Sequence, residues 1–328
     1  MLEESKAVLV TGATGFIGEH VCRHLLGAGY RVRTLLRQQY SSITYDHSFF
    51  EHCTGDLSDP DSLVRACEGI EVIIHIAGVA HADNTNDESL RRVNVGGTER
   101  LLSAALEQKV TRFILMSSSL AGVCDEEGNA TTGYGQSKID AEQLLLSAIS
   151  SGSIEGVILR PVNVYGPGMR GNIASLISRI SRGRMPPLPR LGTPISLIGV
   201  DDLCRVIAIA IESTHANGET YILTDGEQYN VSDIESEIYR ALGKEVPRWK
   251  TPRVLLYLAV AGAELLSKIL NLFGIKLPAL RSVSTRTYRN LTTENLFDNS
   301  EACKELNFKP TSTFYSSLPG IVADFKSL

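Results

Sequence analysis

The fold is decided by Ala7-Val-Leu-Val-Thr-Gly-Ala-Thr-Gly-Phe-Ile-Gly18, a short apolar run that leads into three glycines spaced Gly-x-x-Gly-x-x-Gly. The run Ala7–Val10 predicts a buried strand, and the residues after the glycines, through Leu26, have the periodicity of a helix. Glycines at a strand-to-helix turn let the backbone approach a pyrophosphate closely, and the helix N-terminus presents amide donors to its charge. The stretch therefore predicts a dinucleotide site, with contacts from Gly12, Thr14, Gly15, Phe16, Ile17 and Gly18.

Apolar runs and helical patterns alternate along the first half of the chain. Further strands are expected at Arg31–Leu36, Val72–Ile76, Phe113–Met116 and Val157–Leu159, with helices between them, notably at Arg91–Glu107 and Tyr134–Ser150. This alternation predicts an α/β fold with a Rossmann-type, doubly wound, mostly parallel sheet.

The alternation changes after Gly168, where three prolines between positions 186 and 189 mark an irregular loop. A strand at Ile195–Val200, a helix at Asp201–Ile211 and a strand at Thr220–Leu223 that rejoins the main sheet are expected before a mainly helical C-terminal part. We therefore expect a dinucleotide-binding domain over residues 1–168 and a smaller substrate-binding part over residues 169–328, interleaved with the main sheet around residues 195–223.

Composition indicates an ordinary enzyme of the cytoplasm. The 328 residues carry a net charge of −5 with acids and bases mixed, which excludes the basic footprint of a nucleic-acid-binding protein. The six cysteines are scattered, so neither a zinc site nor a disulfide framework is expected, and no metal is predicted. The first strand begins so early that we expect no signal peptide.

A tyrosine and a lysine lie four residues apart in Tyr134-Gly-Gln-Ser-Lys138, at the start of a helical pattern. Residues i and i+4 share one helix face, and a nearby cation lowers the pKa of a phenol, which suits proton transfer at a carbinol or carbonyl oxygen. Ser117-Ser-Ser119 ends the apolar run before this helix, where open α/β sheets bind ligands. We expect Ser119 to bind the substrate oxygen, and Ser117 and Ser118 merely to end the strand.

These segments, taken in order, resemble the extended short-chain dehydrogenases/reductases. The resemblance covers nearly the whole chain and adds Asp56-Leu57, Asn94-Val-Gly-Gly-Thr98 and Arg160-Pro-Val-Asn-Val-Tyr-Gly-Pro167 to the motifs above. The superfamily includes nucleotide-sugar epimerases and dehydratases, dihydroflavonol reductases and 3β-hydroxysteroid dehydrogenases. It implies a nicotinamide cofactor, and leaves the substrate open.

Carried over residue by residue, the resemblance implies a complete active site. Tyr134 is the acid/base, Lys138 lowers its pKa and holds the nicotinamide ribose, Ser119 orients the reacting oxygen, and Asn94 supports the site. The implied cofactor contacts are Asp56 and Leu57 at the adenine, the close backbone at Ala77 and Gly78, and Pro161, while Asn163 begins the substrate side.

The residue at the end of the second strand bears on the choice between NADP and NAD. NAD sites usually place an acid about 20 residues beyond the last glycine, where it binds the ribose 2′-hydroxyl. Counting from Gly18 reaches Leu36-Arg37-Gln38, which has no acid. An arginine favours a 2′-phosphate, so we expect NADP(H) with Arg37 as a contact, and NAD(H) as the alternative.

Two features indicate different substrates. The arginines at 179, 182, 184 and 190 can hold a diphosphate through bidentate contacts. Of these, Arg184 and Arg190 are the predicted substrate contacts. However, residues 193–200 lack the arginine that sugar-nucleotide enzymes commonly carry before Val-Asp-Asp. Residues 254–273 resemble the apolar helix of the 3β-hydroxysteroid dehydrogenase branch, and Glu264 and Lys268 make them a poor transmembrane span.

The leading interpretation is an epimerase or 4-keto reductase of a nucleotide sugar, with a small-molecule UDP-sugar as partner. The alternative enzyme acts on an apolar hydroxy or keto substrate, and a third alternative is a non-catalytic nucleotide-sensing protein on the same fold. The sequence leaves open a homodimer and a peripheral contact of the 254–273 helix with a membrane surface.

Overall fold

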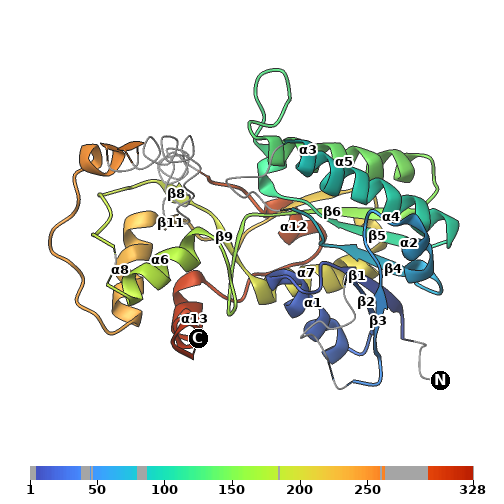
Figure 1. Ribbon diagram of the computed structural model, residues 1–328, viewed down its shortest axis with the longest axis horizontal. Helices are drawn as coiled ribbons and strands as arrows, with labels where there is room; N and C mark the ends of the chain where they lie inside the picture. Colours follow the sequence, from blue (N-terminus) through green and yellow to red (C-terminus); the bar gives the residue numbers. More distant parts are fainter. Residues whose placement is uncertain are drawn as a thin grey trace, which may run out of the picture. The chain divides into compact units, whose positions relative to one another are not determined.

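The computed structural model describes residues 5–37, 45, 47–79, 87–183, 185–258, 261–262 and 295–327. The chain forms two compact units, and each is composed of segments that are separate in the sequence. The first unit contains Met1–Val164, Ile198–Asp225 and Phe297–Thr311, and the second contains Tyr165–Leu197, Gly226–Leu296 and Ser312–Leu328. Figure 1 labels the α-helices and most of the strands of both units.

A seven-stranded parallel sheet forms the centre of the first unit, with strand order β10-β6-β5-β4-β1-β2-β3 (Figure 1). Its strands are β1 (Ala7–Thr11), β2 (Arg31–Leu36), β3 (Phe50–Thr54), β4 (Val72–His75), β5 (Arg112–Met116), β6 (Glu155–Pro161) and β10 (Thr220–Leu223). The chain order of the strands changes direction at β1, with β2 and β3 on one side of it and β4, β5 and β6 on the other. Open α/β sheets bind ligands at such a switch point, at the carboxyl ends of the strands. The predicted Rossmann-type α/β fold is confirmed.

Helices cover both faces of this sheet because its central strands are apolar on both sides. Val8 and Val10 pack with α1, α7 and α12, whereas Ala7 and Leu9 pack with α2, α4 and α5, as the two-residue period of a strand requires. The helical elements of the unit are α1 (Phe16–Gly27), α2 (Pro60–Cys67), α3 (Asp87–Leu90), η1 (Arg91–Val95), α4 (Gly96–Glu107), η2 (Ser119–Gly122), α5 (Gly133–Ser150), α7 (Val200–Glu212), η3 (Thr214–Ala216) and α12 (Ser300–Glu305).

Within its described residues, the second unit contains the helices α6 (Asn172–Ser181), α8 (Val231–Ala241) and α13 (Phe314–Ser327). The short strands β8 (Pro194–Ile195) and β11 (Tyr229–Asn230) pair antiparallel beside them. The Phe314 amide donates to the Tyr229 hydroxyl at 2.9 Å, which fixes the start of α13. Strands β7 (Asn163–Tyr165) and β9 (Leu197–Gly199) lie where the chain leaves the first unit and where it returns.

The structure refines two of the expected elements. The helix expected at 91–107 begins with a turn of π-helix, η1, before the regular helix α4. The strand expected at 195–200 is two short strands, β8 and β9, separated by Ser196. The strand Thr220–Leu223 is confirmed and joins the edge of the main sheet beside β6, as predicted.

Candidate active site

The glycine turn between β1 and α1 forms a close-packed cradle. Gly12 has φ +76, and a Cβ atom there would lie 2.7 Å from the Ala77 amide nitrogen. A Cβ on Gly18 would collide with the Gly12 carbonyl, and the Gly15 amide donates to that same carbonyl at 3.0 Å. Only glycine fits positions 12 and 18. The turn brings the N-terminus of α1 to the carboxyl end of β1. This backbone surface fits the pyrophosphate of a dinucleotide.

The backbone after β4 passes close to the same turn, as expected for Ala77 and Gly78. The Ala77 amide donates to the Thr11 hydroxyl at 3.2 Å. A Cβ on Gly78 would lie 3.0 Å from Asn94 Oδ1 and 3.5 Å from Lys138 Nζ. The absence of a side chain at Gly78 therefore leaves room next to the lysine.

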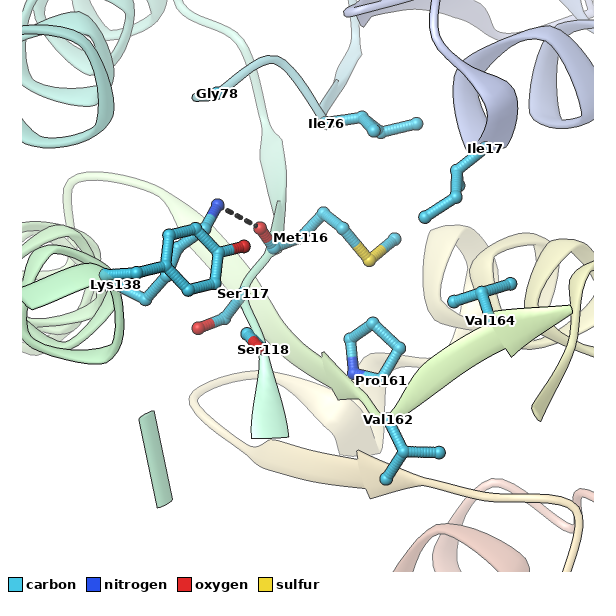
Figure 2. A pocket seen from close by; sticks show the side chains of 11 residues that line it. Ile17, Ile76, Gly78, Met116, Ser117, Ser118, Lys138, Pro161, Val162 and Val164 are labelled. Carbon is cyan, nitrogen blue, oxygen red and sulfur yellow. Dashed lines mark hydrogen bonds between the residues drawn. The ribbon is translucent and has the colours of Figure 1, made fainter. Parts of the chain in front are cut away.

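A cavity of about 210 Å³ lies at the carboxyl ends of these strands (Figure 2). One wall is polar and carries Ser117, Ser118, Tyr134 and Lys138. The remaining wall is mostly apolar and is made by Ile17, Ile76, Gly78, Met116, Pro161, Val162 and Val164. The cavity therefore brings together five residues predicted for the cofactor or the chemistry: Ile17, Gly78, Tyr134, Lys138 and Pro161.

Helix α5 presents Tyr134 and Lys138 to the cavity on one face, as their spacing predicts. The Thr132 hydroxyl caps the helix by accepting from the Gly135 amide at 3.0 Å, so the helix begins at Gly133 and Tyr134 lies in its first turn. Lys138 Nζ lies 5.9 Å from the centroid of the Tyr134 ring. The same ammonium donates to the Met116 carbonyl at 2.9 Å, a contact drawn in Figure 2.

Burial dominates the acid–base properties of this pair. Burial lowers the pKa of Lys138 to about 8, and the Glu142 carboxylate raises it by less. Burial also raises the pKa of Tyr134, and a hydrogen bond with the Ser118 hydroxyl lowers it by less. The loss of solvation is thus the largest effect on the pKa of Tyr134, and the Lys138 ammonium is hydrogen-bonded to the Met116 carbonyl.

The serine beside Tyr134 is Ser118, one position before the residue singled out from the sequence. Ser118 lines the cavity and its hydroxyl is hydrogen-bonded to Tyr134. Ser119 begins η2, is only 6 % exposed, and is not among the residues that line the cavity. The sequence has no feature that distinguishes the three adjacent serines. Which of them faces Tyr134 depends on where the backbone leaves the strand.

Asn94 connects the loop after β4 to the catalytic helix. Its Oδ1 accepts from the Val79 amide at 2.8 Å, and its Nδ2 donates to the Val79 carbonyl at 3.2 Å and to Ser137 Oγ at 3.0 Å. The Ser137 hydroxyl in turn donates to the Tyr134 carbonyl at 2.8 Å. Both amide hydrogens of Asn94 are therefore used within the protein, where they join the loop after β4 to α5.

The predicted adenosine contacts lie at the carboxyl ends of β2 and β3. Asp56 follows β3, and hydrogen bonds from Ser58, with a smaller contribution from the Arg37 charge, lower the pKa of its carboxyl. The Leu57 carbonyl accepts from Arg100 Nε at 2.7 Å, which fixes this turn. Arg37 is exposed at the end of β2, near enough to influence Asp56.

Asn163 and Arg190, two of the residues predicted for the substrate side, belong to different units. Asn163 is exposed at the start of β7 and is absent from the residues that line the cavity. Arg190 is exposed in the second unit, where its carbonyl accepts from Arg253. Arg184 and most of residues 254–273 lie outside the described residues.

The family of the chain follows from its match to known proteins. The model of the NAD dependent epimerase/dehydratase family matches residues 8–232, which is more than half of the chain. The chain belongs to this family and is an NAD(P)-dependent enzyme of the extended short-chain dehydrogenase/reductase class.

Individual relatives represent both branches considered from the sequence. The UDP-glucose 4-epimerase of Vibrio cholerae is 31% identical over 75% of this chain and 78% of its own length. The 3 beta-hydroxysteroid dehydrogenase/Delta 5-->4-isomerase of Mycobacterium tuberculosis is 26% identical over 98% of this chain and 90% of its own. A crystal structure of the UDP-glucuronic acid 4-epimerase from Bacillus cereus, in complex with UDP-glucuronic acid and NAD, superposes with a TM-score of 0.75 at 22% identity, covering 98% of this chain and 99% of that one.

Two further features of the described residues bear on the class of protein. None of their helices is both long and apolar enough to cross a membrane. Their His, Cys, Asp and Glu side chains form no group of three or more that could hold a metal ion.

Proposed function

We propose that this enzyme oxidises and reduces a secondary carbinol or ketone carbon of a nucleotide sugar, as a 4-epimerase or a 4-keto reductase. The observation that carries the proposal is the placement of Tyr134, Ser118 and Lys138 together on the wall of one cavity beside the glycine cradle. A proton donor, a hydroxyl that can hold an oxygen and a cation are the groups that this chemistry needs.

The cofactor is held by residues of the first unit in this proposal. When bound, NAD or NADP accepts and returns the hydride at the substrate carbon. Gly12, Gly15 and Gly18 approach the pyrophosphate, with Thr14, Phe16 and Ile17 around it, and Asp56 and Leu57 flank the adenine. Lys138 binds the nicotinamide ribose, and Pro161 packs against the nicotinamide end of the cavity.

The chain's own residues handle the proton and the oxygen. The Tyr134 phenolate takes the proton from the substrate hydroxyl when the carbon is oxidised, and the phenol formed returns it when the carbonyl is reduced. Ser118 donates a hydrogen bond to the same oxygen, and Lys138 stabilises the phenolate through its charge. Because burial raises the pKa of Tyr134, that cation is needed for the phenolate to form near neutral pH.

The preference for NADP over NAD rests on Arg37 in this proposal. The residue lies at the end of β2 and is exposed, so its guanidinium can meet a 2′-phosphate. The NAD in the Bacillus cereus structure represents the alternative. Competition between the two cofactors for the wild-type protein separates them.

A nucleotide sugar is the leading substrate because the Vibrio cholerae relative is a UDP-glucose epimerase that matches three quarters of the chain. The second candidate, an apolar hydroxy or keto compound, is favoured by the Mycobacterium tuberculosis relative and by the exposed apolar residues Val254, Leu255 and Leu258. The two classes differ in whether the protein must bind a diphosphate.

Calorimetric titration of the wild-type protein with UDP tests this choice. A nucleotide-sugar enzyme is expected to bind UDP, and the affinity should fall with added salt because ionic contacts are screened. No heat at millimolar UDP would favour the apolar substrate. UDP binding without turnover of any UDP-sugar, with cofactor present, would favour a nucleotide-sensing protein.

A further inference from the structure

Glu142 is a buried carboxylate close to the site that the proposed chemistry does not use. It lies on α5 four residues after Lys138, and the residue is only 3 % exposed. Burying a carboxylate is costly unless it is paired and hydrogen-bonded. Glu142, one turn beyond Lys138, therefore needs partners within the protein.

Two partners hold the carboxylate from two neighbouring strands. Arg160 of β6 donates to it through two nitrogens, Nε to Oε1 at 2.8 Å and Nη2 to Oε2 at 2.5 Å. The Ser117 hydroxyl, at the end of β5, also donates to Oε1. Glu142 thereby attaches the middle of α5 to the carboxyl ends of both strands that carry the cavity wall.

The contact with Ser117 is one of three that match α5 to the end of β5. Tyr134, Lys138 and Glu142 are spaced i, i+4, i+8 and form one stripe along the helix. They meet three consecutive residues of the strand end: Ser118 bonds to Tyr134, the Met116 carbonyl accepts from Lys138, and Ser117 donates to Glu142. A shift of the helix along the strand would break all three contacts together.

We propose that Glu142, paired with Arg160, is a positioning residue that holds Tyr134 and Lys138 in place and supplies the negative charge that keeps Lys138 protonated inside the cavity. The catalytic meaning of this inference rests on the proposed function of Tyr134 and Lys138, whereas the charge relation between Glu142 and Lys138 can be measured without any substrate.

The charges around Lys138 identify Glu142 as the neighbour that matters. On α5 itself the lysine faces the phenol of Tyr134, and on β4 it faces His75, whose pKa burial lowers to about 3, so the imidazole is neutral. Asn94 of η1 and the Ser117 hydroxyl carry no charge, and Arg160 of β6 is already paired. Among these named groups, Glu142 is the one anion, and its charge raises the pKa of Lys138.

The sign of the effect distinguishes a charge role from a purely structural one. Glu142→Gln removes the anion and leaves the Arg160 cation, so the pKa of Lys138 should fall from about 8 by about one pH unit or more. If Glu142 only stabilised the fold, the loss of its carboxylate would loosen the site and expose Lys138. The pKa of Lys138 would then rise toward the ordinary value of 10.5.

A second ion pair of the same unit provides a matched control. Glu155 is paired with Arg112 across the same two strands, β6 and β5, but at their amino ends. Glu155→Gln should leave the pKa of Lys138 unchanged. Glu142→Asp keeps the charge and shortens the side chain, so it should keep the lysine pKa near the wild-type value while it weakens the contact with Arg160.

The experiment is an NMR titration of the full chain labelled at the lysine ε-carbons, with the Lys138 signal assigned by its loss in Lys138→Met. The proposal predicts a fall in the Lys138 pKa for Glu142→Gln and no change for Glu155→Gln. A rise or no change in Glu142→Gln, or an equal fall in Glu155→Gln, overturns it.

Folding and function are tested apart from this result. If Glu142→Gln does not fold, the double variant Glu142→Met, Arg160→Met removes both charges without leaving either buried alone, a replacement that buried ion pairs often tolerate. The Lys138 pKa should fall there too, and an unchanged value overturns the charge role. If no UDP-sugar is turned over by the wild type but the lysine pKa falls as predicted, the proposed function fails and the charge relation stands.

Discussion

The two ends of strands β5 and β6 carry the same ion pair chemistry in opposite arrangements. At the carboxyl ends the buried partner is the carboxylate: the Glu142 side chain is 5 % exposed and that of Arg160 is 21 % exposed. At the amino ends the buried partner is the arginine: the Arg112 side chain is 5 % exposed and that of Glu155 is 51 % exposed. The contacts of the buried member of each pair show what each end does, because the protein itself provides the surroundings of a buried group.

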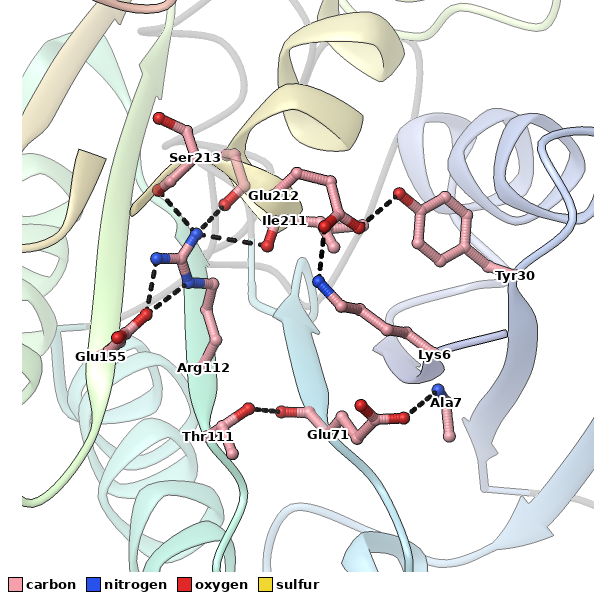
Figure 3. Close-up of polar contacts among 11 residues, drawn as sticks. Lys6, Ala7, Tyr30, Glu71, Thr111, Arg112, Glu155, Ile211, Glu212 and Ser213 are labelled. Atoms are coloured by element: carbon pink, nitrogen blue, oxygen red, sulfur yellow. Dashed lines mark hydrogen bonds and ion pairs between the residues drawn. The ribbon is translucent and has the colours of Figure 1, made fainter. Parts of the chain in front are cut away.

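The buried arginine at the amino ends is used entirely for the fold (Figure 3). Its Nη1 donates to the carbonyls of Ala210 at 2.8 Å, Ile211 at 3.2 Å and Ser213 at 2.7 Å, where α7 ends and helix carbonyls lack partners within the helix. Nε and Nη2 donate to Glu155 at 3.1 and 2.6 Å. With every face of the guanidinium occupied, this end closes a helix onto the sheet and offers nothing to a ligand.

Other contacts at the amino ends have the same character. Glu212 accepts from Lys6 at 2.5 Å and from the Tyr30 hydroxyl at 2.9 Å, and burial together with this carboxylate raises the pKa of Tyr30 to about 12 (Figure 3). Glu71 accepts from the Ala7 amide at 3.1 Å. These pairs join segments that are far apart in the sequence, whereas the carboxyl ends hold Lys138, whose pKa burial lowers to about 8.

The largest difference between the ends is expected from two tyrosines. Tyr134→Phe removes the transferable proton and keeps the ring, so turnover of a UDP-sugar should fall roughly 10²–10⁴-fold while cofactor affinity is retained. Tyr30→Phe, at the amino end, should leave turnover unchanged. Steady-state rates and cofactor titrations of both variants measure this, and near-normal turnover of Tyr134→Phe would end its assignment as the acid/base.

The next effect separates two adjacent serines at the carboxyl end of β5. Ser118→Ala should lower turnover about 10²-fold, as the loss of a hydrogen-bond donor to a developing oxyanion does. Ser119→Ala should have little effect, since Ser119 does not line the cavity. The opposite ranking of the two rates would restore Ser119, the residue singled out from the sequence.

A substitution at the amino ends of β5 and β6 should change the stability of the protein. Arg112→Met leaves the carbonyls at the end of α7 without their donor, so the free energy of unfolding in urea should fall by about 1.5–3 kcal/mol. The exposed pair Arg23–Glu19 on α1 supplies a control, because Arg23→Met should cost less than about 1 kcal/mol. Equal losses in the two variants would mean that the buried arginine is not the closure of α7.

The smallest effect concerns the two ends of β2. Arg37→Ala at the carboxyl end should weaken NADP(H) about tenfold or more and leave NAD(H) nearly untouched, since a charge-assisted hydrogen bond is worth about 1.5–3 kcal/mol. Arg31→Ala, at the amino end of the same strand, should change neither affinity. Fluorescence titration with both cofactors checks this, and equal small effects of Arg37→Ala on the two would argue against NADP.

The sequence predicts most of the sheet because buried parallel strands are continuous apolar runs. Arg31–Leu36 has the predicted limits, and the other strands predicted in the first half differ by one or two residues at one or both ends. No range was predicted for β3. The π-helical turn at η1 was not predicted, because the local pattern of residues 91–95 has no feature that distinguishes it from a regular helix. The contact of Ser118 with Tyr134 was not predicted for a similar reason, since identical neighbours differ only in where the backbone turns.

The support of the site could not be predicted from local patterns. Glu142 and Arg160 are brought together only because α5 crosses over to β6, which lies beside β5. The lysine pKa depends on burial, which spacing within a helix does not report. The glycine cradle, by contrast, was predictable, since the strand, the turn and the helix are contiguous in the chain.

Isotope labelling tests whether Tyr134 at the carboxyl ends serves redox chemistry at a nucleotide-sugar carbon. UDP-glucose carrying deuterium at C4 is incubated with the protein and cofactor, and the sugar products are followed by NMR. Conversion at C4, with deuterium retained in an epimerised product, is expected for the wild type and Tyr30→Phe, and almost none for Tyr134→Phe. Turnover of a sterol alcohol with no change in any UDP-sugar, or equal conversion by Tyr134→Phe, would contradict it.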